Sequence, residues 1–239
     1  MRWGLKGLLW VLLGLGVGWA QSDVETLLRR AASLFQDIQD YSVQMEIRLS
    51  GENLRVPPTT VKVYYKRPGK MRFVAEQGQF VLLPKQGVVV GDWVSQLRAK
   101  AECLWEKDEP LRGRPHSILR FVPKEPQRGV AYVRAWVDRE RLTLSRLEFV
   151  APDESRLQVE VWHTQVQGRY WLPERSEVTF HLRRMGHRPP SLREGEEGPS
   201  LPRDVKATLL FREYRLNQGL SDDLFREEEA PKSGGAKGR

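Results

Sequence analysis

The sequence predicts a mainly β protein built around one large antiparallel sheet, with few helices. Apolar and polar residues alternate in many short segments, whereas only two segments show a helical period. Glycine and proline separate the alternating segments, and consecutive strands joined by short loops usually pair with each other. The chain has a single cysteine, which excludes an intramolecular disulfide framework, so the fold must be held together by packing.

The first 20 residues have the order of a secretory signal. Arg2 and Lys6 precede the apolar run 8–17, and the small residues Gly18 and Ala20 follow it. The uninterrupted apolar run is too short to span a membrane comfortably. We therefore expect cleavage after Ala20 and an exported mature protein.

Residues 22–40 and 93–105 predict two amphipathic helices. In the first, apolar residues recur at steps of three and four: Leu27, Leu28, Ala31, Leu34, Phe35 and Ile38. In the second, one helical face collects Trp93, Val94, Leu97, Ala101, Leu104 and Trp105. The pattern leaves open whether this second helix is an ordinary packing element or a movable lid.

From residue 41 onward the apolar period changes to two. Val43, Met45 and Ile47 face one way, and segments 61–66 and 70–75 repeat the pattern. Further strands are expected at Phe80–Leu83, Val88–Val90, Ser117–Val122, Val130–Asp138, Leu142–Val150, Leu157–Trp162, Val178–Leu182 and Ala207–Tyr214. These half-buried strands belong to a single domain over residues 21–226.

Two segments have the composition of unpacked chain. Residues 183–203 are rich in proline, glycine and charge and lack any period, so we expect a mobile loop. The tail 227–239 is expected to be disordered.

No motif for catalysis or metal binding is found in the sequence. The four histidines lack metal-ligand spacing, and no second cysteine can help them. The acidic pairs lie at predicted turns or strand ends, where aspartate usually accepts hydrogen bonds from local backbone donors. We therefore expect no enzymatic activity, no metal and no cofactor.

The stretch YYKRPGKMRF (64–73) mixes four cations with three aromatic rings, as a nucleic-acid surface would. Strand alternation separates the two kinds of side chain, because Tyr65, Met71 and Phe73 fall on the apolar face. Together with the export signal, this separation argues against nucleic acid. A net charge of +8 is compatible with contact to anionic lipid surfaces.

Five segments occur in an order typical of a known family. They are YSVQMEI (41–47), the Tyr64, Lys66, Arg67, Pro68 turn with Met71, Arg72 and Phe73, then VRAWVD (133–138), GRYWLPERSEV (168–178) and YRLNQGLSDDLF (214–225). In this order they resemble the periplasmic lipoprotein carriers of the LolA type and related outer-membrane lipoprotein-sorting proteins. The resemblance covers nearly the whole mature chain.

This resemblance implies an unclosed β-barrel, a strongly curved antiparallel sheet with an N-terminal helix and lid helices over its concave apolar face. It implies a monomeric periplasmic carrier that shields the acyl chains of lipoproteins or similar amphiphiles between membranes, with partner proteins in the inner and outer membranes. The alternative is an envelope regulator or scaffold of the RseB type, which shares the fold and senses lipid or protein partners without transporting them.

The resemblance also implies roles for particular residues. Arg67 corresponds to an arginine whose hydrogen bonds hold the lid closed, and Trp93 and Leu97 fall on the expected lid. Strand parity and the implied cavity together predict its lining as Val43, Met45, Ile47, Val61, Val63, Tyr65, Met71, Phe73, Val133 and Val178.

Overall fold

The fold was analysed in a computed structural model of the chain. It describes residues 15–51, 56–75, 93–125, 130–181 and 206–226. The expected strands at 80–83 and 88–90, the loop 183–203 and the tail 227–239 lie outside the described residues.

Ten antiparallel strands form one sheet in the order β3-β2-β1-β10-β9-β8-β7-β6-β5-β4. Their bounds are β1 Asp40–Ser50, β2 Thr59–Lys66, β3 Lys70–Ala75, β4 Ala101–Leu111, β5 Arg114–Pro123, β6 Tyr132–Asp138, β7 Leu144–Val150, β8 Arg156–Val166, β9 Tyr170–His181 and β10 Lys206–Leu216. The strands β4 to β10 form a meander, and β1 pairs with β10 and so joins the N-terminal strands to it. No pairing joins β3 to β4 among the described residues, so the barrel is unclosed, as predicted.

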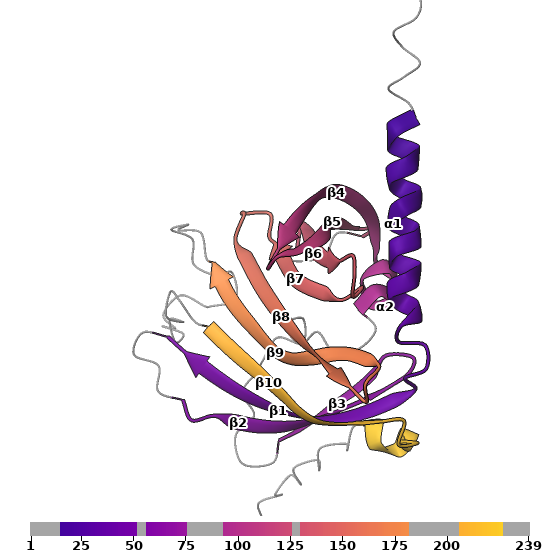
Figure 1. The fold of residues 1–239 in the computed structure, drawn as a ribbon. Coiled ribbons are helices and arrows are strands. Elements are labelled where there is room, and N and C mark those ends of the chain that lie inside the picture. The colour runs from indigo at the N-terminus through magenta and orange to yellow at the C-terminus, as the bar shows by residue number, and fades with distance from the viewer. Residues whose placement is uncertain (1–14, 52–55, 76–92, 126–129, 182–205, 227–239) are drawn as a thin grey trace, which may run out of the picture.

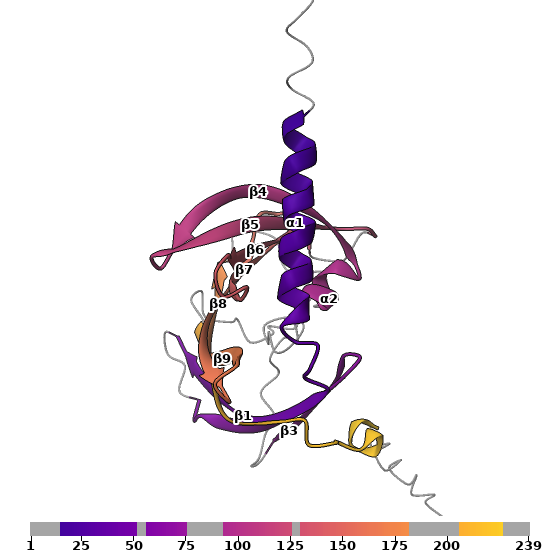
Figure 2. The ribbon, with the colours of Figure 1, turned by 45° about the vertical axis from the view of Figure 1, so that its right-hand side comes forward.

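Two helices cover one side of this sheet. Helix α1 spans Leu15–Ser33 and helix α2 spans Trp93–Arg98, while a short 3-10 helix, η2, follows the last strand at Asp222–Phe225. Figure 1 shows α1 and α2 side by side, and Figure 2 shows the sheet as a C-shaped layer with both helices along its open side. We call α1 and α2 together the helical cover.

The apolar core lies between the helical cover and the sheet. Val24, Leu28 and Ala31 of α1 belong to the same buried cluster as the alternate residues of the strands. Cross-strand neighbours such as Val43 and Val63 come from facing positions of β1 and β2. Because strand side chains alternate between the two faces, the period-two pattern selects one face of the sheet for burial.

The outer face of the sheet accounts for much of the arginine content. The Glu106 carboxylate pairs with Arg120 and Arg134 at 3.2 and 3.0 Å. Glu148 in turn pairs with Arg134 and Arg156 at 3.3 and 3.2 Å. These cross-strand pairs on β4 to β8 use polar residues that the alternation places opposite the core.

The expected helix over 93–105 is wrong in its second half. The helix ends at Arg98, and residues 101–111 form strand β4. Cys103 and Trp105 lie opposite Phe121 and Leu119 of β5, which places all four side chains on the same face. The alternation from Ala101 fits a strand as well as a helix, and pairing with β5 decides between the two because it satisfies the backbone groups.

The first helix is also shorter at its end than the expected 22–40. It ends at Ser33, and the turns that follow lead directly into β1. Phe35, Gln36 and Ile38 donate backbone hydrogen bonds to residues three positions earlier. These tight turns still bury Phe35 and Ile38, so the apolar spacing served packing without continuing the helix. The described part of α1 also spans Ala20, and cleavage there stays a prediction.

Candidate functional site

The inner face of the sheet brings the ten predicted lining residues into one apolar cluster. Eight are buried, and the other two, Met71 and Phe73 of β3, are partly buried and pack against the cluster. The buried members are Val43, Met45, Ile47, Val61, Val63, Tyr65, Val133 and Val178. The structure thus places these residues together, while their role in holding a ligand stays a prediction.

The helical cover closes this face with apolar contacts and a few polar ones. Trp93 and Val94 of α2 are buried in the cluster, and Leu97 packs against it from a partly buried position. An ion pair of 2.9 Å between Arg98 and Glu25 joins α2 to α1. Because both charged groups are about half exposed, this pair contributes little to stability.

Arg67 directly follows β2 and connects the sheet to the segment after α1. Its guanidinium Nη2 donates a hydrogen bond of 2.8 Å to the carbonyl oxygen of Phe35, just after the helix. Its backbone N–H donates to the carbonyl oxygen of Gln39 at 2.9 Å. The predicted latch residue therefore contacts the segment that follows α1, and its function as a latch stays a prediction.

The remaining cations of this hairpin bind the chain's own C-terminal segment, residues 217–226, which we call the C-terminal strap. Lys66 and Lys70 both pair with the Asp222 carboxylate, at 2.6 and 3.0 Å. Arg72 donates to the carbonyl oxygen of Leu224 at 2.6 Å. The two lysines lower the pKa of Asp222 to about 2. Asp222 and Asp223 form one of the acidic pairs that sequence analysis placed at turns or strand ends, with local backbone donors as the expected partners.

Asp40 holds the other end of the C-terminal strap. Its buried carboxylate accepts backbone hydrogen bonds from Gln218, Gly219 and Leu220 at 2.7, 3.0 and 3.1 Å. Sequence analysis missed this contact because it joins residues about 180 positions apart. The only sequence signal for it is an aspartate placed where an apolar strand begins.

Three polar atoms in the apolar interior lack hydrogen-bond partners among the described residues. They are the Tyr41 hydroxyl, the Trp93 indole nitrogen and the Ser176 hydroxyl, and all three side chains are buried. The Tyr41 ring stacks on Tyr65 with 5.0 Å between ring centroids, and burial raises the pKa of its hydroxyl well above the usual value. An unpaired buried polar group costs about 1–3 kcal/mol.

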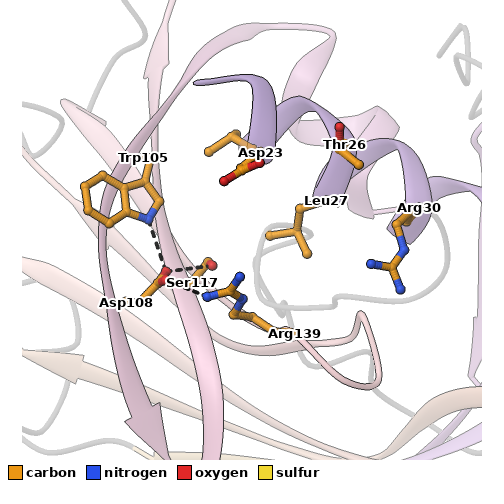
Figure 3. Close-up of a pocket in the computed structure, with 9 residues that line it drawn as sticks. Asp23, Thr26, Leu27, Arg30, Trp105, Asp108, Ser117 and Arg139 are labelled. Carbon is orange, nitrogen blue, oxygen red and sulfur yellow. Dashed lines mark hydrogen bonds and ion pairs between the residues drawn. The ribbon is translucent and has the colours of Figure 1, made fainter. Parts of the chain in front are cut away.

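A pocket of about 340 Å³ lies between α1 and the inner side of β4 and β5. The Trp105 ring, 43% exposed, forms one wall, and Leu27 of α1 forms another (Figure 3). The Asp108 carboxylate accepts hydrogen bonds from Trp105 Nε1, Ser117 Oγ and Arg139 Nη1 at 3.1, 2.8 and 2.7 Å. The pocket therefore opens where the helical cover meets the end strand of the sheet.

Chemically, the described residues offer a surface for apolar binding. No group of three or more histidine, cysteine, aspartate or glutamate side chains that could hold a metal ion occurs among them. Within the same residues, no helix has both the length and the apolar character needed to cross a membrane. The Cys103 thiol is partly buried on the inner face, and desolvation raises its pKa to about 12, so it is a thiol at neutral pH.

No protein-family model and no curated protein matches this chain by sequence. Its fold does match solved structures. A domain designated an outer-membrane lipoprotein-sorting protein, from Vibrio parahaemolyticus, has a TM-score of 0.63 at 14% identity, with 84% of this chain and 95% of that chain covered. A DUF1329 family protein from Desulfovibrio piger has a TM-score of 0.62 at 15% identity, with 87% and 98% covered.

A LolA superfamily protein from Nitrosomonas europaea has a TM-score of 0.54 at 13% identity, with 87% of this chain and 97% of that chain covered. At such low identities the likeness concerns the fold. This chain therefore has the LolA-type architecture that the order of its sequence motifs predicted.

Proposed function

We propose that the protein is an exported, non-catalytic carrier that binds acyl chains of lipoproteins or similar amphiphiles on the apolar inner face of its sheet. The observation that carries this proposal is the continuous apolar surface of a curved, unclosed sheet beneath two helices. The proposed place of action is the periplasm, and the proposed partners are membrane proteins that deliver and accept the cargo.

Acyl chains need such a surface in an aqueous compartment. Exposing each CH₂ group to water costs about 0.8 kcal/mol, so a multiply acylated anchor needs a protein to shield it. Aliphatic side chains such as Val63 and Met45 bind by contact area, which suits cargo without specific polar groups. No covalent step is needed for such a cycle.

Release requires that the helical cover move. Among the described residues, the half-exposed Arg98–Glu25 pair joins its two helices. The segment after α1 is held by Arg67, by an ion pair of Asp37 with Arg169 and by hydrogen bonds with Asn217. Acyl chains that enter between the cover and the sheet replace the apolar contacts of Val24 and Leu28, so the cost of opening is largely recovered on loading.

One observation favours the RseB-type regulator as the second candidate. Eight of the ten predicted lining residues are buried, as in the closed core of a protein that holds no lipid. A regulator would use the same fold to recognise a protein partner, with the inner face acting as its core.

The decisive experiment identifies what the mature protein carries. We expect acyl lipids or lipopeptides in the mass spectrum of protein purified from the cell envelope, and binding of a fluorescent acyl probe in vitro. Phe73→Lys places a charge on the inner face of β3, and we expect it to weaken probe binding at least tenfold.

Val74→Lys is the matched control. Val74 directly follows Phe73 in β3, so its side chain points to the opposite face of the sheet, and it is 37% exposed. This variant should bind the probe normally. A mature protein that carries no lipid and binds no acyl probe would overturn the carrier proposal, and stoichiometric capture of an envelope protein in its place would support the regulator.

A further inference from the structure

A second pocket, of about 310 Å³, lies at the ends of the strands, where the turns after β6 and β8 approach the end of α1. We call it the turn pocket. It is lined by Ser33, Leu34 and Phe35, by residues 140–143 of the β6–β7 turn, and by residues 169–171 at the start of β9. Its volume is in the lower range of pockets that bind small molecules.

Arg141 supplies the turn pocket with a cation that has no acidic partner in the described ranges of the chain. Its guanidinium lies over the Trp171 ring at 4.0 Å from the centroid. Its side chain forms no ion pair with any residue that the structure describes. The ring holds the guanidinium in place while its N–H donors stay available for a carboxylate or phosphate, which arginine binds with two parallel hydrogen bonds.

Thr143 contributes an unused donor to the same pocket. This residue is only 2% exposed, and its hydroxyl has no hydrogen-bond partner within the described part of the chain. Since buried hydroxyl groups are nearly always paired, this one is available for a ligand that enters the pocket.

The rest of the lining balances charge against apolar surface. Arg169 lies over the Tyr170 ring at 5.1 Å and pairs with Asp37, so it adds little free charge. Glu140 also lines the pocket, but it is exposed and its charge is screened by solvent. Leu34, 41% exposed, provides an apolar wall beside the free guanidinium.

We propose that the turn pocket binds the anionic headgroup, a carboxylate or a phosphate, of the amphiphile whose acyl chains lie on the inner face. Arg141 and Thr143 hydrogen-bond the anion, and Leu34 and the aromatic rings contact the carbon atoms next to it. The anion site stands on its own residues, whereas the link to acyl chains rests on the proposed carrier function.

The test compares a fluorescent fatty acid with its methyl ester, which has the same chain and no charge, on the mature protein. The wild type should bind the acid at least tenfold more tightly than the ester. Arg141→Gln should abolish this preference and leave ester binding unchanged. Thr143→Val, which keeps the shape and removes the hydroxyl, should reduce the preference severalfold.

Arg215→Gln is the control, because it removes one exposed arginine of β10 that does not line the pocket. It should keep the full preference for the acid. Equal binding of acid and ester by the wild type would overturn the headgroup site while leaving the carrier function intact.

Titration with inorganic phosphate separates the remaining outcomes. If phosphate binds through Arg141 but neither acyl probe binds, the carrier function fails and the pocket is a site for a free anion, which also overturns the headgroup assignment. If phosphate competes with the fatty acid in the wild type and not in Arg141→Gln, the headgroup site is supported.

Discussion

Two groups of cations lie in turns at the same end of the sheet's strands, and the fold uses them differently. In the β2–β3 hairpin, Lys66, Lys70 and Arg72 bind the C-terminal strap, so their charges are satisfied within the chain. In the turn pocket, Arg141 lies on an aromatic ring and has no acidic partner among the described residues. The hairpin cations hold the C-terminal strap, whereas the turn pocket contains a guanidinium with no acidic partner in the described part of the chain.

The difference shows that local composition does not identify a binding surface. The hairpin has the sequence most typical of a binding site, with four cations within 64–73. Three of these cations are nevertheless bound to the C-terminal strap, about 150 positions away. The fourth, Arg67, bonds the carbonyl oxygen of Phe35. The β6–β7 turn that holds Arg141 is also dense in charge, because residues 138–141 are all charged. Which of its cations has an acidic partner depends on which acids the fold places nearby.

The largest predicted effect comes from releasing the C-terminal strap. Asp40→Ala removes the acceptor of three backbone N–H groups and should lower the free energy of unfolding by about 3 kcal/mol, as measured by urea titration. Limited proteolysis should then cut within residues 217–226. The control Asp223→Ala, at an exposed position of the same strap, should change stability by less than about 0.5 kcal/mol. If Asp40→Ala is as stable as the control, the hydrogen bonds from the C-terminal strap to Asp40 do not stabilise the fold.

The buried surroundings of His163 on β8 should appear in a histidine titration. Burial, followed by the charges of Arg112 and Arg114, lowers the pKa of His163 from 6.5 to about 3. The unfolded chain therefore binds the proton first, and stability should fall as the pH decreases from about 6.5 toward 3.

We expect His163 to account for about 2 kcal/mol of this loss of folding free energy. A change of one in pKa corresponds to about 1.4 kcal/mol, and the partial exposure of the side chain reduces the effect. His163→Gln should remove this part of the pH dependence in urea unfolding measured between pH 7 and 4. An unchanged slope would contradict the lowered pKa of His163 and its main cause, burial.

Arg67 sharpens the comparison, because it is the cation of the hairpin that bonds the segment after the first helix. Arg67→Leu should leave the domain folded, since one such hydrogen bond contributes about 1 kcal/mol. It should speed dissociation of an acyl probe about fivefold, measured by stopped-flow fluorescence. Lys62→Leu, on the same strand, is the control and should have no effect on dissociation. Equal rates for both variants would remove the latch role of Arg67.

The smallest predicted effect concerns the exposed contact of Asp222 with Lys66 and Lys70. Because the folded-state pKa of Asp222 is depressed from 3.8 to about 2, its contribution is present above pH 4 and is lost as the pH falls toward 2. Asp222→Asn should flatten this acid limb of the melting temperature. Asp223→Asn keeps both lysine contacts and should retain it. The window lies below that of His163 over most of its range, so the two effects are separable.

The strands were predictable because their signal is local. Residues such as Val43, Met45 and Ile47 alternate with polar neighbours, and this alternation placed them correctly on the inner face. The same rule separated Tyr65 and Phe73 from the hairpin cations. The helix expected over 93–105 was wrong beyond Arg98, because the apolar positions from Ala101 to Trp105 fit both periods.

The sequence by itself determined which face of each strand is apolar, the antiparallel sheet and the family resemblance, because side-chain alternation and motif order are written along the chain. Only the tertiary structure decided which cations are neutralised. Asp40 and Asp222 reach their partners through the pairing of β1 with β10, and Arg141 meets Trp171 where two turns converge. Which charged groups are neighbours depends on distances in space, and residues far apart in sequence come close only when the sheet has formed.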